Sequence, residues 1–232
     1  MSDSQEDLKM VKPRGLSGNV AIAMFVLAFF CVVFAFFSAS WIVSDSRITG
    51  AKFDRLGLWT HCFRSLPDPN DEYIRRFFAG CRWIFDPFTK GYDQIRGYLV
   101  PGFLVVTELF YTLTFIATIF CAVLVLLFFL FFTPEHKRFV ELTLIIGSSL
   151  VAAGVSAALA VIVFALFGNR DNWMPGHANN FFGWSFAVAI ASIFALLISG
   201  GLFLVETKTQ EKKRRQMKES QARFEMEQET KA

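Results

Sequence analysis

The stretch WIVSDSRITGAKFDRLGLWTHC, residues 41–62, and a second cysteine at position 81 decide the fold of this chain. The stretch follows one long apolar run and precedes another. Cys31 and Cys121 lie deep inside such runs, where a loop cysteine could not reach them. Four cysteines allow three pairings, and this placement leaves Cys62 with Cys81. That disulfide would close a loop of about 20 residues, worth roughly 3 kcal/mol, and it needs an oxidising compartment. We therefore expect the loop to face outward.

The composition predicts a membrane protein. Hydrophobic residues make up 54% of the 232 residues, 29 residues are phenylalanine, and charged residues make up 19%, unlike a soluble domain. Four runs are long and apolar enough to cross a bilayer as helices. We expect spans at about 18–40, 104–132, 140–167 and 181–205, outer loops at 41–103 and 168–180, an N-terminal segment at 1–17 and a tail at 206–232.

The first outer loop carries signals for both strands and a helix. From Trp41 to Phe63, β-branched and aromatic residues are interrupted by Gly50 and Gly57, which predicts strands. From Asp71, apolar residues recur at helical spacing until Gly80, which predicts a short helix.

Charge and aromatic placement predict the orientation of the spans. All five tryptophans would fall in outer loops or at the outer ends of spans, where amphipathic rings are favoured. Lysines and arginines lie beside the ends assigned to the inside: Lys9, Lys12, Arg14, Lys137, Arg138, Lys208, Lys212, Lys213, Arg214, Arg215 and Lys218. We expect both termini to be cytosolic and the tail to be a basic helix.

The ordered residues of the first loop resemble a known family signature. Trp41, the triplet Gly57-Leu58-Trp59, Cys62 and Cys81 are similar to the W, GLW, C and C signature of the claudin and peripheral-myelin-protein superfamily. Arg96 resembles the arginine that closes the first extracellular loop in claudins. The resemblance implies a membrane protein with a four-transmembrane α-helix bundle and a small, disulfide-stabilised extracellular antiparallel β-sheet.

Two features differ from vertebrate claudins. The interval between Cys62 and Cys81 is much longer, and the chain ends in Thr230-Lys231-Ala232 without the tyrosine-valine terminus that vertebrate claudins offer to PDZ domains. Both features resemble the invertebrate claudin-like proteins of septate junctions. Because the tyrosine-valine terminus is missing, we expect no PDZ-binding C-terminus.

The resemblance implies a structural cell–cell junction protein that forms or organises a paracellular barrier of the septate-junction type. It would act at lateral junctions of the plasma membrane, associate with copies of itself in the same or the facing membrane, and contact other junction membrane proteins. An auxiliary subunit of an ion channel or receptor is the alternative. A paracellular ion pore is a third reading, because Arg82 occupies the neighbourhood where some claudins select ions by charge.

Other kinds of site find little support. His61, His136 and His177 share no metal-ligand spacing, and no serine–histidine–aspartate set or phosphate loop can be assembled, so we expect no enzyme, no metal and no cofactor. The run Lys212-Lys213-Arg214-Arg215 either contacts anionic lipid head groups or serves only as a charged anchor that fixes the topology, and it is not a nucleic-acid site.

Overall fold

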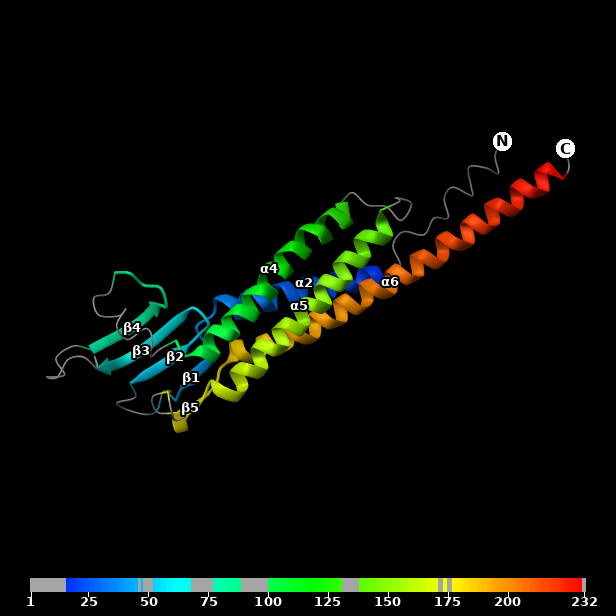
Figure 1. Ribbon diagram of the computed structural model, residues 1–232. Coiled ribbons are helices and arrows are strands. Elements are labelled where there is room, and N and C mark those ends of the chain that lie inside the picture. Colours follow the sequence, from blue (N-terminus) through cyan, green and yellow to red (C-terminus); the bar gives the residue numbers. More distant parts are fainter. Residues whose placement is uncertain are drawn as a thin grey trace.

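The computed structural model describes residues 16–45, 47, 52–67, 77–88, 100–130, 138–170, 173–174 and 177–230. Within these ranges, four helices are long and apolar enough to cross a membrane. They are α2 (Leu16–Phe37), α4 (Gly102–Leu130), α5 (Phe139–Phe167) and α6 (Trp184–Glu229). The helices lie side by side as one elongated bundle, with a small sheet at one end (Figure 1). The four-helix plan that the sequence predicts is confirmed.

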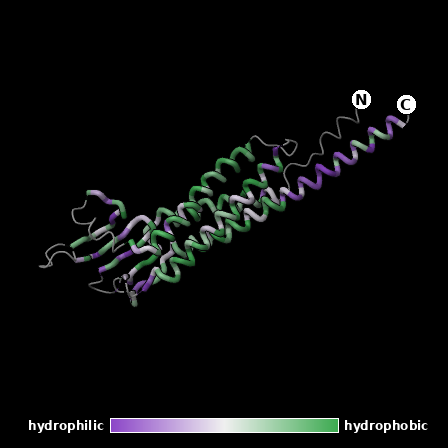
Figure 2. The backbone as a smooth tube through the Cα atoms, in the orientation of Figure 1, coloured by the Kyte–Doolittle hydropathy of each residue, from purple (hydrophilic) through white to green (hydrophobic). Residues whose placement is uncertain are grey.

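The helices meet through small residues. Helix α6 packs against both α2 and α5, and α4 packs against α5. A Cβ atom on Gly147 would lie 2.9 Å from Leu204, and one on Gly154 would lie 2.7 Å from Leu197, so glycine permits the α5–α6 approach. The outward faces of the bundle are apolar and exposed, as a lipid solvent requires. Figure 2 shows that the helices of the bundle consist of hydrophobic residues along most of their length, up to the hydrophilic end of α6.

Helix α6 does not stop with its apolar part. Beyond Glu206 the chain is rich in Lys, Arg, Glu and Gln, which are strong helix formers, and the helix continues to Glu229. This polar extension points away from the sheet and is the long hydrophilic arm in Figure 2.

The sheet has five strands in the order β4-β3-β2-β1-β5, and every neighbouring pair is antiparallel. The strands are β1 (Ile42–Ser44), β2 (Phe53–Leu56), β3 (Thr60–Pro67), β4 (Phe77–Trp83) and β5 (Asn180–Phe182), the last preceded by a 3₁₀ turn, η2 (His177–Asn179). Because β5 pairs with β1, the segment between α5 and α6 joins the same sheet as the segment between α2 and α4.

The structure corrects two expectations. Residues from Phe77 to Gly80 form part of β4, not the end of a helix, because they pair with β3, and Gly80 has a positive φ of 85° within the strand. Residues 71–76 of the expected helix lie outside the described residues. Phe181 and Phe182, expected in the fourth span, instead belong to β5, and α6 begins at Trp184.

Candidate functional site: the disulfide-bonded sheet and its seat on the bundle

Trp41 fastens the sheet to the helices. Its indole Nε1 donates a hydrogen bond to the carbonyl oxygen of Ala35, 2.8 Å away, in the last turn of α2. Its fully buried ring lies edge-on to Tyr111 of α4, Phe164 of α5 and Phe186 of α6, at centroid distances of 5.3, 4.9 and 5.6 Å. One side chain therefore contacts all four helices.

The backbone of Trp41 continues this connection into the sheet. Its N–H donates to the carbonyl of Leu56 at 2.7 Å, and its carbonyl accepts from the N–H of Gly183 at 2.9 Å. The hydrogen bonds thus join β2 and the start of α6 through a single residue. The sheet, the helix bundle and the segment between α5 and α6 therefore meet at Trp41.

The Gly57-Leu58-Trp59 triplet forms the turn between β2 and β3. The N–H of Gly57 donates to the carbonyl of Thr60 at 2.9 Å. A Cβ on Gly57 would collide with the Ser38 carbonyl oxygen and lie 2.6 Å from the Ala39 Cα. Only glycine therefore allows the turn to lie this close to the chain that leaves α2. The next residue in the turn, Leu58, is fully buried.

Trp59, the last residue of the triplet, contacts helix α2. Its ring lies 5.4 Å from Phe36 of α2 and 6.5 Å from Phe85, just after β4. Its carbonyl accepts a hydrogen bond from the N–H of Ile84 at 3.0 Å. Trp59 therefore packs between the end of α2 and the end of β4.

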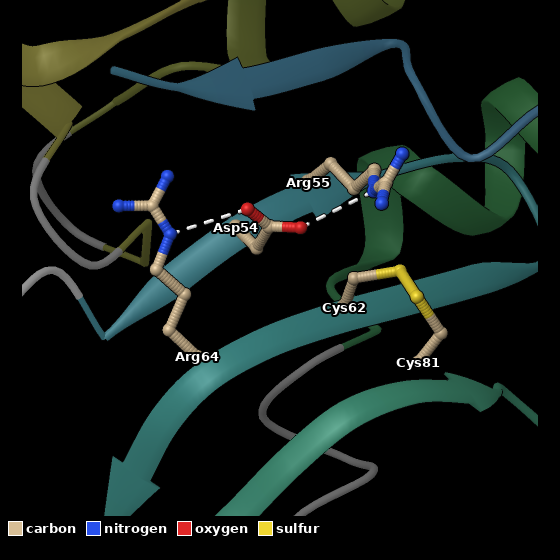
Figure 3. The surroundings of a disulfide bond; sticks show 5 residues. All are labelled: Asp54, Arg55, Cys62, Arg64 and Cys81. Carbon is tan, nitrogen blue, oxygen red and sulfur yellow. Dashed lines mark hydrogen bonds and ion pairs between the residues drawn. A yellow bond between two sulfur atoms is a disulfide. The ribbon is translucent and has the colours of Figure 1, made fainter. Parts of the chain in front are cut away.

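The Cys62–Cys81 disulfide is confirmed, and it joins the edge strand β4 to its neighbour β3. The cysteines are direct cross-strand partners of β3 and β4, separated by 19 positions in the chain. Cys31 and Cys121 are free thiols in α2 and α4. Figure 3 shows the disulfide beside an ionic group that the sequence analysis missed.

That ionic group is one carboxylate shared by two guanidinium groups. Asp54 Oδ2 lies 3.2 Å from Arg55 Nε, and Asp54 Oδ1 lies 3.2 Å from Arg64 Nε (Figure 3). Arg64 also donates to the carbonyl oxygen of Asp45 at 3.4 Å. The group carries a net positive charge on the sheet and ties β2 to β3. Arg64 is ten positions away from Asp54 in the chain, and the two side chains meet because β2 pairs with β3. No local sequence pattern therefore indicates this ionic group.

The two faces of the sheet differ in character. Cross-strand partners share a face, and one row runs through Ile42, Leu56 and His61, all buried. The next row runs through Arg55, Cys62 and Cys81 and is partly exposed at Arg55 and Cys81. The disulfide therefore lies on the more open face.

Arg82 is the partner of His61 in β4, so it stands at the edge of the buried row. It is half-buried, and its Nε atom has no hydrogen-bond partner among the described residues. Arg96, the remaining motif residue, lies outside the described residues.

The basic run of α6 lies far from this site. Lys212, Lys213 and Arg215 are exposed and Arg214 is half-buried on the polar extension, at the end of the molecule opposite the sheet. The described residues contain no group of three histidine, cysteine, aspartate or glutamate side chains that could hold a metal ion.

Burial of His61 makes the sheet sensitive to acid. Burial lowers the pKa of His61 from the ordinary 6.5 to about 4. Between these two pH values the unfolded chain binds a proton that the folded sheet does not, so folding stability falls as the pH drops. By pH 4 the loss amounts to about 3 kcal/mol.

We expect His61→Leu to weaken this acid sensitivity. The measurement is the unfolding temperature in detergent at pH 7 and pH 5, for the wild type and for His61→Leu. Carboxylates titrate in both proteins, so their contribution cancels in the comparison. Equal losses of unfolding temperature in the two proteins would contradict the assignment to His61.

The comparison with known families covers most of the described fold. A family model described as PMP-22/EMP/MP20/Claudin tight junction matches residues 26–205. The matched range begins within α2 and ends within α6, and it includes all five strands, Trp41 and both cysteines of the disulfide. No curated protein matches the chain.

Proposed function

Because the chain belongs to the PMP-22, EMP, MP20 and claudin tight-junction family, we propose that it is a structural junction protein of the septate-junction type. Its extracellular sheet would seal the space between neighbouring cells at lateral contacts of the plasma membrane, with both termini in the cytosol. The observation that carries the proposal is the attachment of the sheet to the helix bundle, in which Trp41 contacts all four helices.

A barrier must hold a surface of fixed shape against another cell, and several contacts restrain the shape of this sheet. The disulfide closes its β3–β4 half, Trp41 and Gly57 fix its base, and β5 ties it to the second outer segment. The long interval between the cysteines, 19 positions, supports the septate-junction type over the vertebrate tight-junction type.

Strand β4 offers a surface for self-association. It is an edge strand, paired in the described residues with β3 on one side. The unpaired backbone groups of an edge strand can bind another chain. Strand β3 runs away from the bundle and β4 returns (Figure 1), so Phe77 at the start of β4 lies at the far end of the sheet, where it is 51% exposed. Contacts with copies in the same or facing membrane would use this edge.

Two further roles belong to the same proposal. Arg82, half-buried on the edge strand, would contribute positive charge to an ion-selective path if copies enclose one. The exposed Lys212, Lys213 and Arg215, together with Arg214, would contact anionic lipid head groups beneath the inner leaflet.

The barrier role predicts a leak when the protein is lost. In an epithelium that lacks the protein and any close paralogue, we expect fluorescent dextran to cross between cells and the septa seen by electron microscopy to be disordered. Expression of the wild type should restore exclusion. Normal exclusion of the dextran and normal septa in the deficient epithelium would reject the barrier role, and co-purification with a channel subunit would then favour the auxiliary-subunit alternative.

Rescue by variants locates the contact. Phe77→Glu should reach the cell surface at the wild-type level but fail to restore exclusion, because a charge is placed in the cell–cell contact. Phe224→Glu, a change of an exposed phenylalanine on the α6 extension, serves as the matched control and should rescue fully. Full rescue by Phe77→Glu would remove the far end of β4 from the contact while leaving the barrier role standing.

A further inference from the structure

Three exposed aromatic side chains gather where β4 ends nearest the bundle. Trp83 is 54% exposed, Phe85 48% and Phe88 90%. We call these residues the proximal aromatic edge. Exposed aromatic side chains that lie close together in this way mark a contact surface. The barrier function proposed above does not account for it, because it lies at the opposite end of the strand from Phe77.

The local structure holds these rings outward. Between them, Ile84 is buried, and its N–H donates to the Trp59 carbonyl at 3.0 Å. The N–H of Asp86 donates to the Trp83 carbonyl at 3.0 Å, and Asp86 Oδ1 accepts from the N–H of Phe88 at 2.9 Å. These hydrogen bonds form a closed turn with its aromatic residues on the outside. The exposure is therefore a property of an ordered turn.

A chain of ring contacts connects this edge to the membrane-spanning helices. Phe115 of α4 stacks on Phe36 of α2 at 4.3 Å, and Phe36 lies 5.4 Å from Trp59. Trp59 lies 6.5 Å from Phe85, and Phe85 lies 5.2 Å from Trp83. The edge is thus a few ring widths from the last turn of α2.

The length of α2 sets the depth of that last turn. Its 22 residues span about 33 Å, close to the roughly 30 Å thickness of the hydrocarbon core. Phe36 and Phe37, at its end, therefore lie near the outer boundary of the hydrocarbon. The proximal aromatic edge then lies at the level of the lipid head groups.

Exposed phenylalanines lie at the helix end of this chain of ring contacts. Phe34 and Phe37 of α2 are exposed, and Phe37 contacts both Phe36 and Phe115. Aromatic rings favour the boundary between hydrocarbon and water, and tryptophan does so most clearly because it combines a large apolar ring with one polar N–H.

We propose that the proximal aromatic edge inserts into the outer leaflet of the membrane in which the protein itself resides, where it binds lipid at the boundary between head groups and acyl chains. Exposed aromatic residues also follow the other edge of the sheet, at Phe181 of β5 and Trp184 of α6. Lipid contact at both edges fixes the tilt of the sheet, and hence the direction in which its far end faces the neighbouring cell.

Quenching of tryptophan emission tests the lipid contact. The protein is placed as a single copy in nanodiscs of phosphatidylcholine, with or without bromine atoms on the acyl chains. Bromine quenches nearby tryptophans, so the emission of the wild type should fall in brominated discs. The fall should be smaller for Trp83→Phe, which removes the reporter at the edge. An equal fall in the two proteins would overturn the proposal.

A second pair of variants separates lipid from a protein partner. Phe85→Asp combined with Phe88→Asp should reduce the bromine-dependent loss of emission, whereas Phe77→Asp at the far end of β4 should leave it unchanged. If the emission of Trp83 is instead quenched by acrylamide in single-copy discs and protected in discs that hold two copies, the edge is a contact between copies and the lipid proposal is wrong.

Discussion

Replacing Cys62 and Cys81 together with alanine is expected to remove most of the protein from the cell surface. The disulfide joins the β3 and β4 pair, which extends furthest from the helices and has little core of its own. Loss of a native disulfide from a small extracellular module costs about 2–5 kcal/mol. A sheet this small cannot offset that loss by burial alone, so the variant should be retained in the secretory pathway.

Surface biotinylation of the variant and the wild type measures this loss. Cys31→Ala is the matched control, because Cys31 is a free thiol in α2 and its removal leaves the disulfide intact. Peptide mapping without reductant should recover the cross-linked pair from wild-type protein at the surface. Surface protein with free thiols at positions 62 and 81, or a double variant present at the wild-type level, would refute the expectation.

Trp41→Ala should destabilise the whole protein by about 3–5 kcal/mol, the usual cost of removing a buried aromatic side chain from a packed core. The ring is fully buried and edge-on to aromatic rings of α4, α5 and α6. Its loss would leave a cavity where the sheet meets the bundle. The Ala35 carbonyl, in the last turn of α2, would also lose its indole donor.

The unfolding temperature in detergent, with surface abundance as a second readout, tests this effect. Trp41→Phe keeps most of the ring but removes the N–H, and should cost about 1–3 kcal/mol for the unpaired carbonyl. Trp184→Ala is the control, because Trp184 is exposed at the start of α6. A stable Trp41→Ala protein that reaches the surface but fails to exclude dextran would make Trp41 a contact residue instead of a fold residue.

The Trp41 variant and the cysteine double variant weaken different parts of the same extracellular structure. Trp41 holds the sheet on the helices, and the disulfide holds together the part of the sheet that reaches away from them. The carboxylate of Asp54, shared by Arg55 and Arg64, ties the strands between these two points. The proposed barrier depends on all three, because a surface pressed against another cell must resist deformation.

Local patterns in the sequence determined the four helices, the disulfide and the position of the sheet in the chain. Long apolar runs predict spans because every backbone polar group in a membrane must be satisfied within a helix. The cysteine pairing followed from the placement of Cys31 and Cys121 inside such runs. The ordered motif residues Trp41, Gly57, Leu58 and Trp59 indicated the family before any contact was known.

Only the tertiary structure decided which distant segments meet. Strand β5 is three residues long and follows another helix, so no local pattern distinguishes it from the start of α6 until it pairs with β1. The segment from Phe77 to Gly80 has helical spacing, yet pairing with β3 overrides it, because strand hydrogen bonds come from a partner far away in the sequence. The roles of Gly57 and Trp41 likewise depend on approaches by Ser38 and by the helices, and such approaches exist only after the bundle has formed.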